Sequence, residues 1–159
     1  MSTPILSEYP TIRTLDLGTR AHLSRSMAGW WTLPERRHST PQIVPGQDGG
    51  LPRRVVNGPI RFLHEVFVDG RYDINGAVLS DPAEGWRTNR SLLETACEPA
   101  AASPWTFEAV HHLPSGATRT ANIQVLDITF PSRFAGIAAE ITLDILVPTG
   151  TFTFEAAAP

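Results

Sequence analysis

The sequence predicts a mainly β protein: an antiparallel β-sandwich with one α-helix at about 82–97 and a long loop rich in proline and glycine at about 34–54. Three observations predict this fold class. Short runs that alternate apolar and polar residues recur along the chain, as in half-buried strands. One segment alone has apolar residues at helical spacing behind a capping residue. Glycine and proline turn signals separate these runs.

Composition indicates one globular domain over 1–159, with a C-terminal tail at about 155–159 that we expect to fray. Hydrophobic residues make up 42% of the chain and charged residues 18%, which is sufficient for a buried core. The net charge of −3 lacks the basic excess that binding to nucleic acid needs, so no specific nucleic acid partner is expected. All 13 basic residues are arginine, which reflects either GC-rich coding or a preference for arginine at interfaces.

Neither a disulfide nor a membrane segment is expected. Cys97 is the single cysteine, so folding in a reducing cytoplasm is the natural assumption. The first residues lack the basic and apolar regions of a signal peptide. No run of about 18 apolar residues is present that could span a membrane.

Two short strands are predicted within 11–33. The pair Trp30 and Trp31 lies at the end of this segment, just before the long loop. Adjacent tryptophans on a strand face opposite ways. At least one of them is therefore expected to pack against the following loop or a neighbouring subunit. The alternative is that both tryptophans close the edge of the core.

The loop from Arg36 to Arg54 holds three prolines and three glycines in 19 residues, a composition too broken for a core strand or helix. Long loops in small domains are usually binding elements or disordered. Two arginines stand at each end of this one, so we interpret it as a docking surface. The residues expected at a subunit interface are Trp30, Trp31, Arg36, Arg37, Arg53 and Arg54.

The middle of the chain predicts a half-buried strand and then the helix. From 60 to 68 one face carries Ile60, Phe62, His64, Val66 and Val68 and is almost wholly apolar, and the other carries Arg61, Leu63, Glu65 and Phe67. The strand ends at an Asp-Gly turn.

For the helix, Asp81 is the expected cap, Pro82 begins the first turn, and Glu84 has the spacing of a capping box. Trp86, Leu93 and Ala96 or Cys97 recur at helical spacing, with Leu92 beside them, and form a narrow apolar stripe. This stripe must lie on a sheet, because no second helix is expected.

The last third predicts further strands at 105–111, 121–130 and 137–147, with an edge strand at 152–154. These segments alternate in the same way and are separated by Pro-Ser-Gly and Pro-Ser-Arg turns. Together with the earlier strands they complete an antiparallel sandwich on which the helix packs.

The residue patterns predict no catalytic, cofactor or metal site. His111 and His112 are neighbours on a strand, so they point to opposite faces and cannot ligate one ion. Cys97 lies in the helical stripe, where a small buried thiol is the ordinary interpretation. The Asp48 and Asp69 carboxylates stand in Asp-Gly turn signals rather than in a hydrolase pattern. The glycines of 46–50 lack the lysine and the strand-to-helix setting of a phosphate loop.

Several motifs follow one another along the chain: the arginine-bounded Pro45-Gly-Gln-Asp-Gly-Gly50 loop, Arg53-Arg-Val-Val56, Val68-Asp-Gly70 and the capped helix with Asn89-Arg-Ser-Leu-Leu93. This order resembles the N-terminal, tail-tube-like domain of the distal tail and minor tail proteins of long-tailed bacteriophages, especially those of actinobacteria. By pattern the resemblance covers about 33–99, and later strands agree in order.

The resemblance implies a non-enzymatic structural protein of the virion tail, assembled in the bacterial cytoplasm. It implies a β-sandwich with one helix that forms rings, hexameric in this family, between the tail tube and the tail tip or baseplate. Its partners would be further copies of itself and the adjacent tube and tip proteins. Many distal tail proteins carry a second, carbohydrate-binding-like domain that this sequence does not contain, so receptor binding is not implied.

Two alternatives stay open. One is another tail structural protein, a tail tube or tail terminator. The other is a monomeric β-sandwich module that binds carbohydrate through exposed tryptophans chosen from Trp30, Trp31, Trp86 and Trp105, of which Trp86 is expected to be buried.

Overall fold

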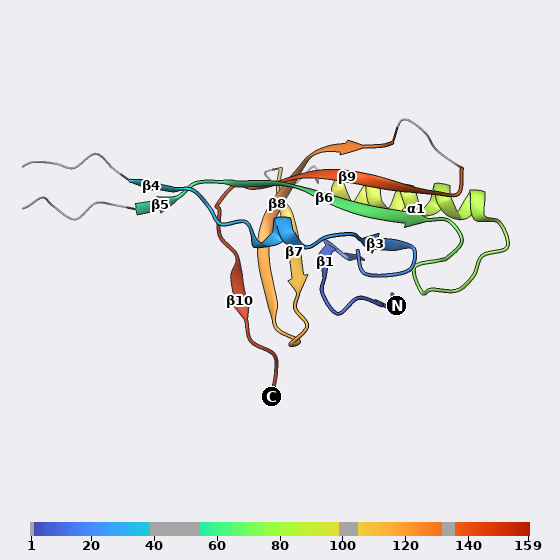
Figure 1. Cartoon of the computed structure of the whole chain (residues 1–159), viewed down its shortest axis with the longest axis horizontal. Coiled ribbons are helices and arrows are strands. Elements are labelled where there is room, and N and C mark those ends of the chain that lie inside the picture. Colours follow the sequence, from blue (N-terminus) through green and yellow to red (C-terminus); the bar gives the residue numbers. More distant parts are fainter. Residues whose placement is uncertain (1, 39–54, 99–104, 132–135) are drawn as a thin grey trace, which may run out of the picture.

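The computed structural model describes residues 2–38, 55–98, 105–131 and 136–159. In chain order the elements are β1 (Tyr9–Ile12), β2 (Leu15–Asp16), β3 (His22–Ser24), the 3-10 helix η1 (Ala28–Trp31), β4 (Arg36–His38), β5 (Val55–Asn57), β6 (Ile60–Asp69), α1 (Pro82–Cys97), β7 (Phe107–His112), β8 (Thr118–Thr129), β9 (Ala138–Val147) and β10 (Thr153–Glu155). The predicted mainly β fold is confirmed, and its α-helix has the expected bounds (Figure 1).

Most of the strands form one curled antiparallel sheet of eight strands, in the order β2-β1-β7-β8-β9-β6-β3, with β10 beside β8. The outermost strands, β2 and β3, follow each other in sequence and meet in space. Just after β2, Gly18 forms an isolated β-bridge with Leu23 of β3, and the amide of Ser24 donates to the carbonyl of Leu17 at 2.9 Å. The sheet is therefore almost closed into a barrel-like sandwich, an arrangement that leaves few unpaired edges.

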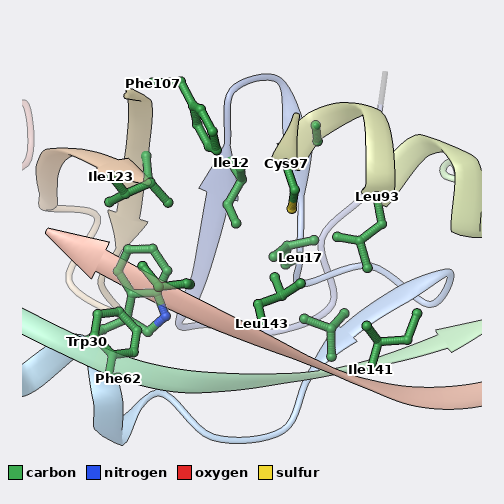
Figure 2. Close-up of a cluster of buried hydrophobic side chains, with 14 of the residues drawn as sticks. Ile12, Leu17, Trp30, Phe62, Leu93, Cys97, Phe107, Ile123, Ile141 and Leu143 are labelled. Atoms are coloured by element: carbon green, nitrogen blue, oxygen red, sulfur yellow. The ribbon is translucent and has the colours of Figure 1, made fainter. Parts of the chain in front are cut away.

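The core lies inside this curl and is richest where β6 pairs with β9 (Figure 2). Their register sets Phe62 opposite Ile145 and Val66 opposite Ile141, so the inward residues of both strands interdigitate. The predicted apolar face of 60–68 is confirmed, because its five residues are all buried. The buried member that is not apolar is His64.

The helix α1 covers one side of the curl, packing on β6 and also contacting β2 and β8. Its start is built as predicted, since Asp81 Oδ1 accepts from the amides of Ala83 and Glu84 at 3.1 and 3.2 Å. The capping box is not completed, because the Glu84 carboxylate pairs with Arg87 at 3.1 Å. The predicted burial of Trp86 is confirmed.

The helix approaches β6 closely because two glycines meet where they touch. A Cβ on Gly85 would lie 2.1 Å from the carbonyl oxygen of Gly70, and a Cβ on Gly70 would lie 2.1 Å from the carbonyl oxygen of Pro82. Both distances are far below van der Waals contact, so only glycine permits this spacing.

Some predicted boundaries were wrong. The 11–33 segment contributes three short strands, β1 to β3, and ends in the helical turn η1, so Trp30 and Trp31 do not lie on a strand. The loop predicted from about 34 begins later, because Arg36–His38 pairs with Val55–Asn57 as an antiparallel ribbon. The C-terminal edge strand is confirmed one residue further on, as β10 beside β8.

Candidate assembly surface

The ribbon of β4 and β5, called the arm below, extends away from the curled sheet at one end of the molecule (Figure 1). It is antiparallel, with Arg36 opposite Asn57 and Arg37 opposite Val56. The amide of Gly58 donates to the carbonyl of Glu35 at 2.7 Å and continues the ladder toward the body. Two paired strands hold each other extended, so the arm is a shaped projection and not a simple connector.

Four residues of the arm, Arg36, Arg37, Val56 and Asn57, are exposed to solvent. Arg36 and Arg37 are exposed, and Val56 is 44% exposed although it is apolar. Within the described part of the chain no ion pair involves either arginine. An unpaired basic ribbon with an exposed valine has the composition of an interface rim. The expected interface residues Arg53 and Arg54, and the rest of the predicted loop at 39–54, lie outside the described residues.

The base of the arm is fixed by a tight backbone contact. Gly150 has a φ of +63°, a conformation that favours glycine, and follows the end of β9. A Cβ at this position would lie 1.9 Å from the carbonyl oxygen of Gly58 and 3.1 Å from the Cβ of Pro34. The two chains that enter the arm therefore rest directly on the turn after β9, which sets its direction.

Trp30 anchors the same end of the fold from within. It is fully buried, packs edge-on against Phe62 with ring centroids 5.3 Å apart, and donates from Nε1 to His64 Nδ1 at 3.3 Å. Its side chain is thus occupied inside the subunit and is not available to a neighbouring one. The sequence placed Trp30 among the interface residues because neighbouring tryptophans cannot be assigned to inside or outside by pattern alone.

Trp31 remains accessible at the foot of the arm, with 50% of its surface exposed. Its indole Nε1 donates to Glu8 Oε1 at 2.9 Å, and the guanidinium of Arg119 lies 4.4 Å from the ring centroid. Arg119 also donates to the carbonyl oxygen of Trp30 at 2.9 Å. These contacts hold the ring in one orientation, which lowers the entropic cost of using it as a contact.

Three histidines, His22, His64 and His111, are fully buried, and the sequence did not assign them a role. His22 Nε2 bonds the carbonyl of Asn89 at 2.7 Å, so this nitrogen carries the proton. His111 Nε2 contacts Glu8 Oε1 at 2.8 Å. Burial lowers the pKa of each of the three, so all are neutral near neutral pH.

Ser24 and His64 are 2.9 Å apart, but their bonding is wrong for a nucleophile and its base. Because Trp30 donates to His64 Nδ1, the His64 proton lies on Nε2, the atom that faces the serine. The Ser24 hydroxyl itself donates to the carbonyl of Leu17 at 2.7 Å. The pair therefore lacks the free basic nitrogen that would activate a hydroxyl.

The other candidate groups of the sequence have structural settings. Burial raises the pKa of the Cys97 thiol to about 12, which disfavours the reactive thiolate. Asp69 forms a two-pronged pair with Arg71 in the turn after β6, at 2.7 and 3.0 Å. His111 points into the core, whereas His112 stacks on Tyr9 with ring centroids 4.5 Å apart. Asp48 lies outside the described residues.

The described residues also lack two other kinds of feature. Those residues contain no group of three or more His, Cys, Asp or Glu side chains that could hold a metal ion. Within the same ranges, no helix has the length and apolar character needed to cross a membrane.

Comparison with known proteins gives one kind of match. No family model matches the chain, and no curated protein matches it. Among solved structures, the chain is similar to the crystal structure of the SPP1 Dit (gp 19.1) protein, described as a paradigm of the hub adsorption apparatus in phages that infect Gram-positive hosts. The TM-score is 0.45 and the sequence identity is 14%, over 88% of this chain and 49% of that one. This chain thus spans about half the length of that protein.

Proposed function

We propose that this chain is a structural protein of a phage tail that assembles into a ring, as a distal tail or minor tail protein between the tail tube and the tail tip. The observation that carries the proposal is the arm, a paired ribbon with exposed arginines that projects from a nearly closed sheet. Ring subunits contact each other through two different surfaces, and a projecting element is a direct way to reach the next copy.

Two further features support this role. The motif order resembles that of distal tail and minor tail proteins, for which sixfold rings are the implied assembly. The mainly β fold with one helix agrees with the fold that this resemblance implies. In such a ring, Arg36, Arg37 and Trp31 are the described residues that we assign to the subunit contact. A tail tube or tail terminator protein would use the same kind of contact at another level of the tail.

The test is a charge reversal on the arm, Arg36→Glu with Arg37→Glu. Both side chains are exposed, so the variant is expected to fold and to lose the assembled form, because reversed charges repel the surface that the arginines meet. The control is Arg25→Glu with Arg61→Glu, which changes the net charge equally at exposed positions of the body. Sedimentation of both variants reports assembly, and normal rings from the arm variant would refute the proposal.

A carbohydrate-binding module is the second candidate, since Trp31 is 50% exposed and Trp105 is 69% exposed. Exposed indoles stack on sugar rings, and their fluorescence shifts when they do. A glycan panel that shifts the fluorescence of a monomeric protein, with the shift lost in Trp105→Ala, would favour this function over the tail protein.

A further inference from the structure

A groove lies at the end of the molecule away from the arm, between the first half of α1 and the turn that precedes it. It has a volume of about 390 Å³, and its lining is mainly apolar, with Ile74, Leu79 and Leu92 contributing side chains. Leu92 is 38% exposed although it stands on a helix whose opposite side is buried. Such a concave apolar surface is suited to receiving a side chain or a short ribbon.

The rim of the groove is acidic. Asp73, Asp81 and Glu84 stand around the apolar lining. Each aspartate uses one carboxylate oxygen, Oδ1, for backbone amides, so Oδ2 is left for another donor. Glu84 pairs with Arg87, but both side chains are mostly exposed, and such pairs contribute little and exchange easily. Within the described residues the rim thus holds three carboxylates, and one guanidinium, that of Arg87, pairs with them.

The arm offers the complementary pattern. Residues directly opposite each other in an antiparallel ribbon have their side chains on one face, so Arg37 and Val56 share a face and Arg36 lies on the other. One face of the arm thus pairs a basic group with an apolar one, as the groove pairs an acidic rim with an apolar floor. Figure 1 places the arm and the turn before α1 at opposite ends of the long axis, so one molecule cannot make this contact with itself.

We infer that the groove of one copy binds the arm of the next, with Val56 on the apolar floor and Arg37 at the acidic rim. The contact is heterologous, because the two surfaces differ, and it closes into a ring when the rotation between copies permits. This inference rests on the proposed ring function and names the surface that receives the arm. It also makes association salt-dependent, since the rim and the arm are exposed charges.

The test uses two variants that each lose one of the two surfaces. Arg37→Glu disables the arm and keeps the groove, whereas Glu84→Gln with Leu92→Glu disables the groove and keeps the arm. Each variant alone is expected to sediment as a monomer, with its self-association weakened about tenfold or more. Mixed together they should form a one-to-one heterodimer and no ring, because only one productive arm and one productive groove are present.

Matched controls separate this contact from general charge effects. Arg25→Glu makes the same charge change at an exposed position of the body and should assemble normally. Leu126→Glu places a carboxylate on another apolar residue of similar exposure, 43%, and Glu108→Arg reverses a charge on β7, so both should assemble normally. Should the groove double variant fail to fold by circular dichroism, Leu92→Glu alone, at an exposed position, replaces it.

The outcomes distinguish the inference from the proposed function. Wild-type rings together with normal rings from the groove variants, or a mixture that stays monomeric, would overturn the groove contact and leave the ring function standing. A wild-type chain that stays monomeric at every concentration would overturn both. Monomeric single variants and a heterodimer on mixing support the contact.

Discussion

Mild acid should destabilise this fold through His64, which is buried as a neutral base between Trp30 and Ser24. The pKa of His64 is lowered from 6.5 to about 4, chiefly by burial, with a backbone hydrogen bond at Ser26 acting in the opposite direction and the charge of His111 adding to the decrease. The unfolded chain therefore takes up this proton first as the pH falls. The stability that neutral His64 contributes is complete above pH 6.5 and is lost progressively down to about pH 4.

The magnitude follows from the size of this pKa difference. One pKa unit corresponds to about 1.4 kcal/mol, so the full effect is roughly 3 kcal/mol, of which about 2 kcal/mol is lost between about pH 7 and about pH 5. The pKa values of His22 and His111 are lowered by burial as well, so they add to the loss with the same sign. The carboxylates whose pKa is lowered, Asp69 and Asp144, titrate below this window, under the ordinary value of 3.8.

The assay is urea unfolding at a series of pH values, followed by tryptophan fluorescence, for the wild type and His64→Gln. Glutamine still accepts and donates hydrogen bonds but does not titrate. Whatever its absolute stability, the variant should show a shallower slope of unfolding free energy against pH than the wild type. The difference should correspond to about one fewer proton taken up on unfolding. Equal slopes in the two proteins between about pH 6 and about pH 5 would refute the assignment of His64 as a buried neutral group.

Three substitutions test the packing of the helix. Gly85→Ala forces α1 away from Gly70 and should lower the unfolding free energy by about 1–3 kcal/mol, whereas Ser91→Ala on the exposed face should change it by less than about 0.5 kcal/mol. Asp81→Ala removes the helix cap and should cost about 1 kcal/mol, which Asp81→Asn should largely restore. Asn89→Ala leaves two carbonyls without the amide that now bonds them at 2.8 Å, and should cost about 1–3 kcal/mol or more. Thermal melts of each variant beside the wild type decide all three, and unchanged midpoints would contradict the close packing described.

The strand at 60–69 and the helix at 82–97 could be predicted because local pattern determines them. Alternation along 60–68 and the Asp81-Pro82 start are visible in a short window of sequence. Closure of the sheet could not be predicted, because the bridge of Gly18 to Leu23 depends on how far eight strands curl together. Histidines on apolar faces were a usable signal of a buried polar network, but their partners come from elements distant in the sequence, the helix α1 and the strand β3.

The assembly surface could be predicted only in part. The arginine cluster marked the arm, and the pairing of Arg36–His38 with Val55–Asn57 depends on a contact across a long connection. Trp30 and Trp31 were indistinguishable by sequence, and one became core while the other stayed half exposed. The groove joins residues 73–81 with the outer face of α1, a juxtaposition that no local pattern shows.

Electron microscopy of the purified full chain, over a wide range of concentrations, tests the central claim most directly. We expect closed rings with rotational symmetry in which adjacent copies touch through the arm. Particles that are monomeric at all concentrations, without rings, would contradict the assignment of this chain as a ring-forming tail protein.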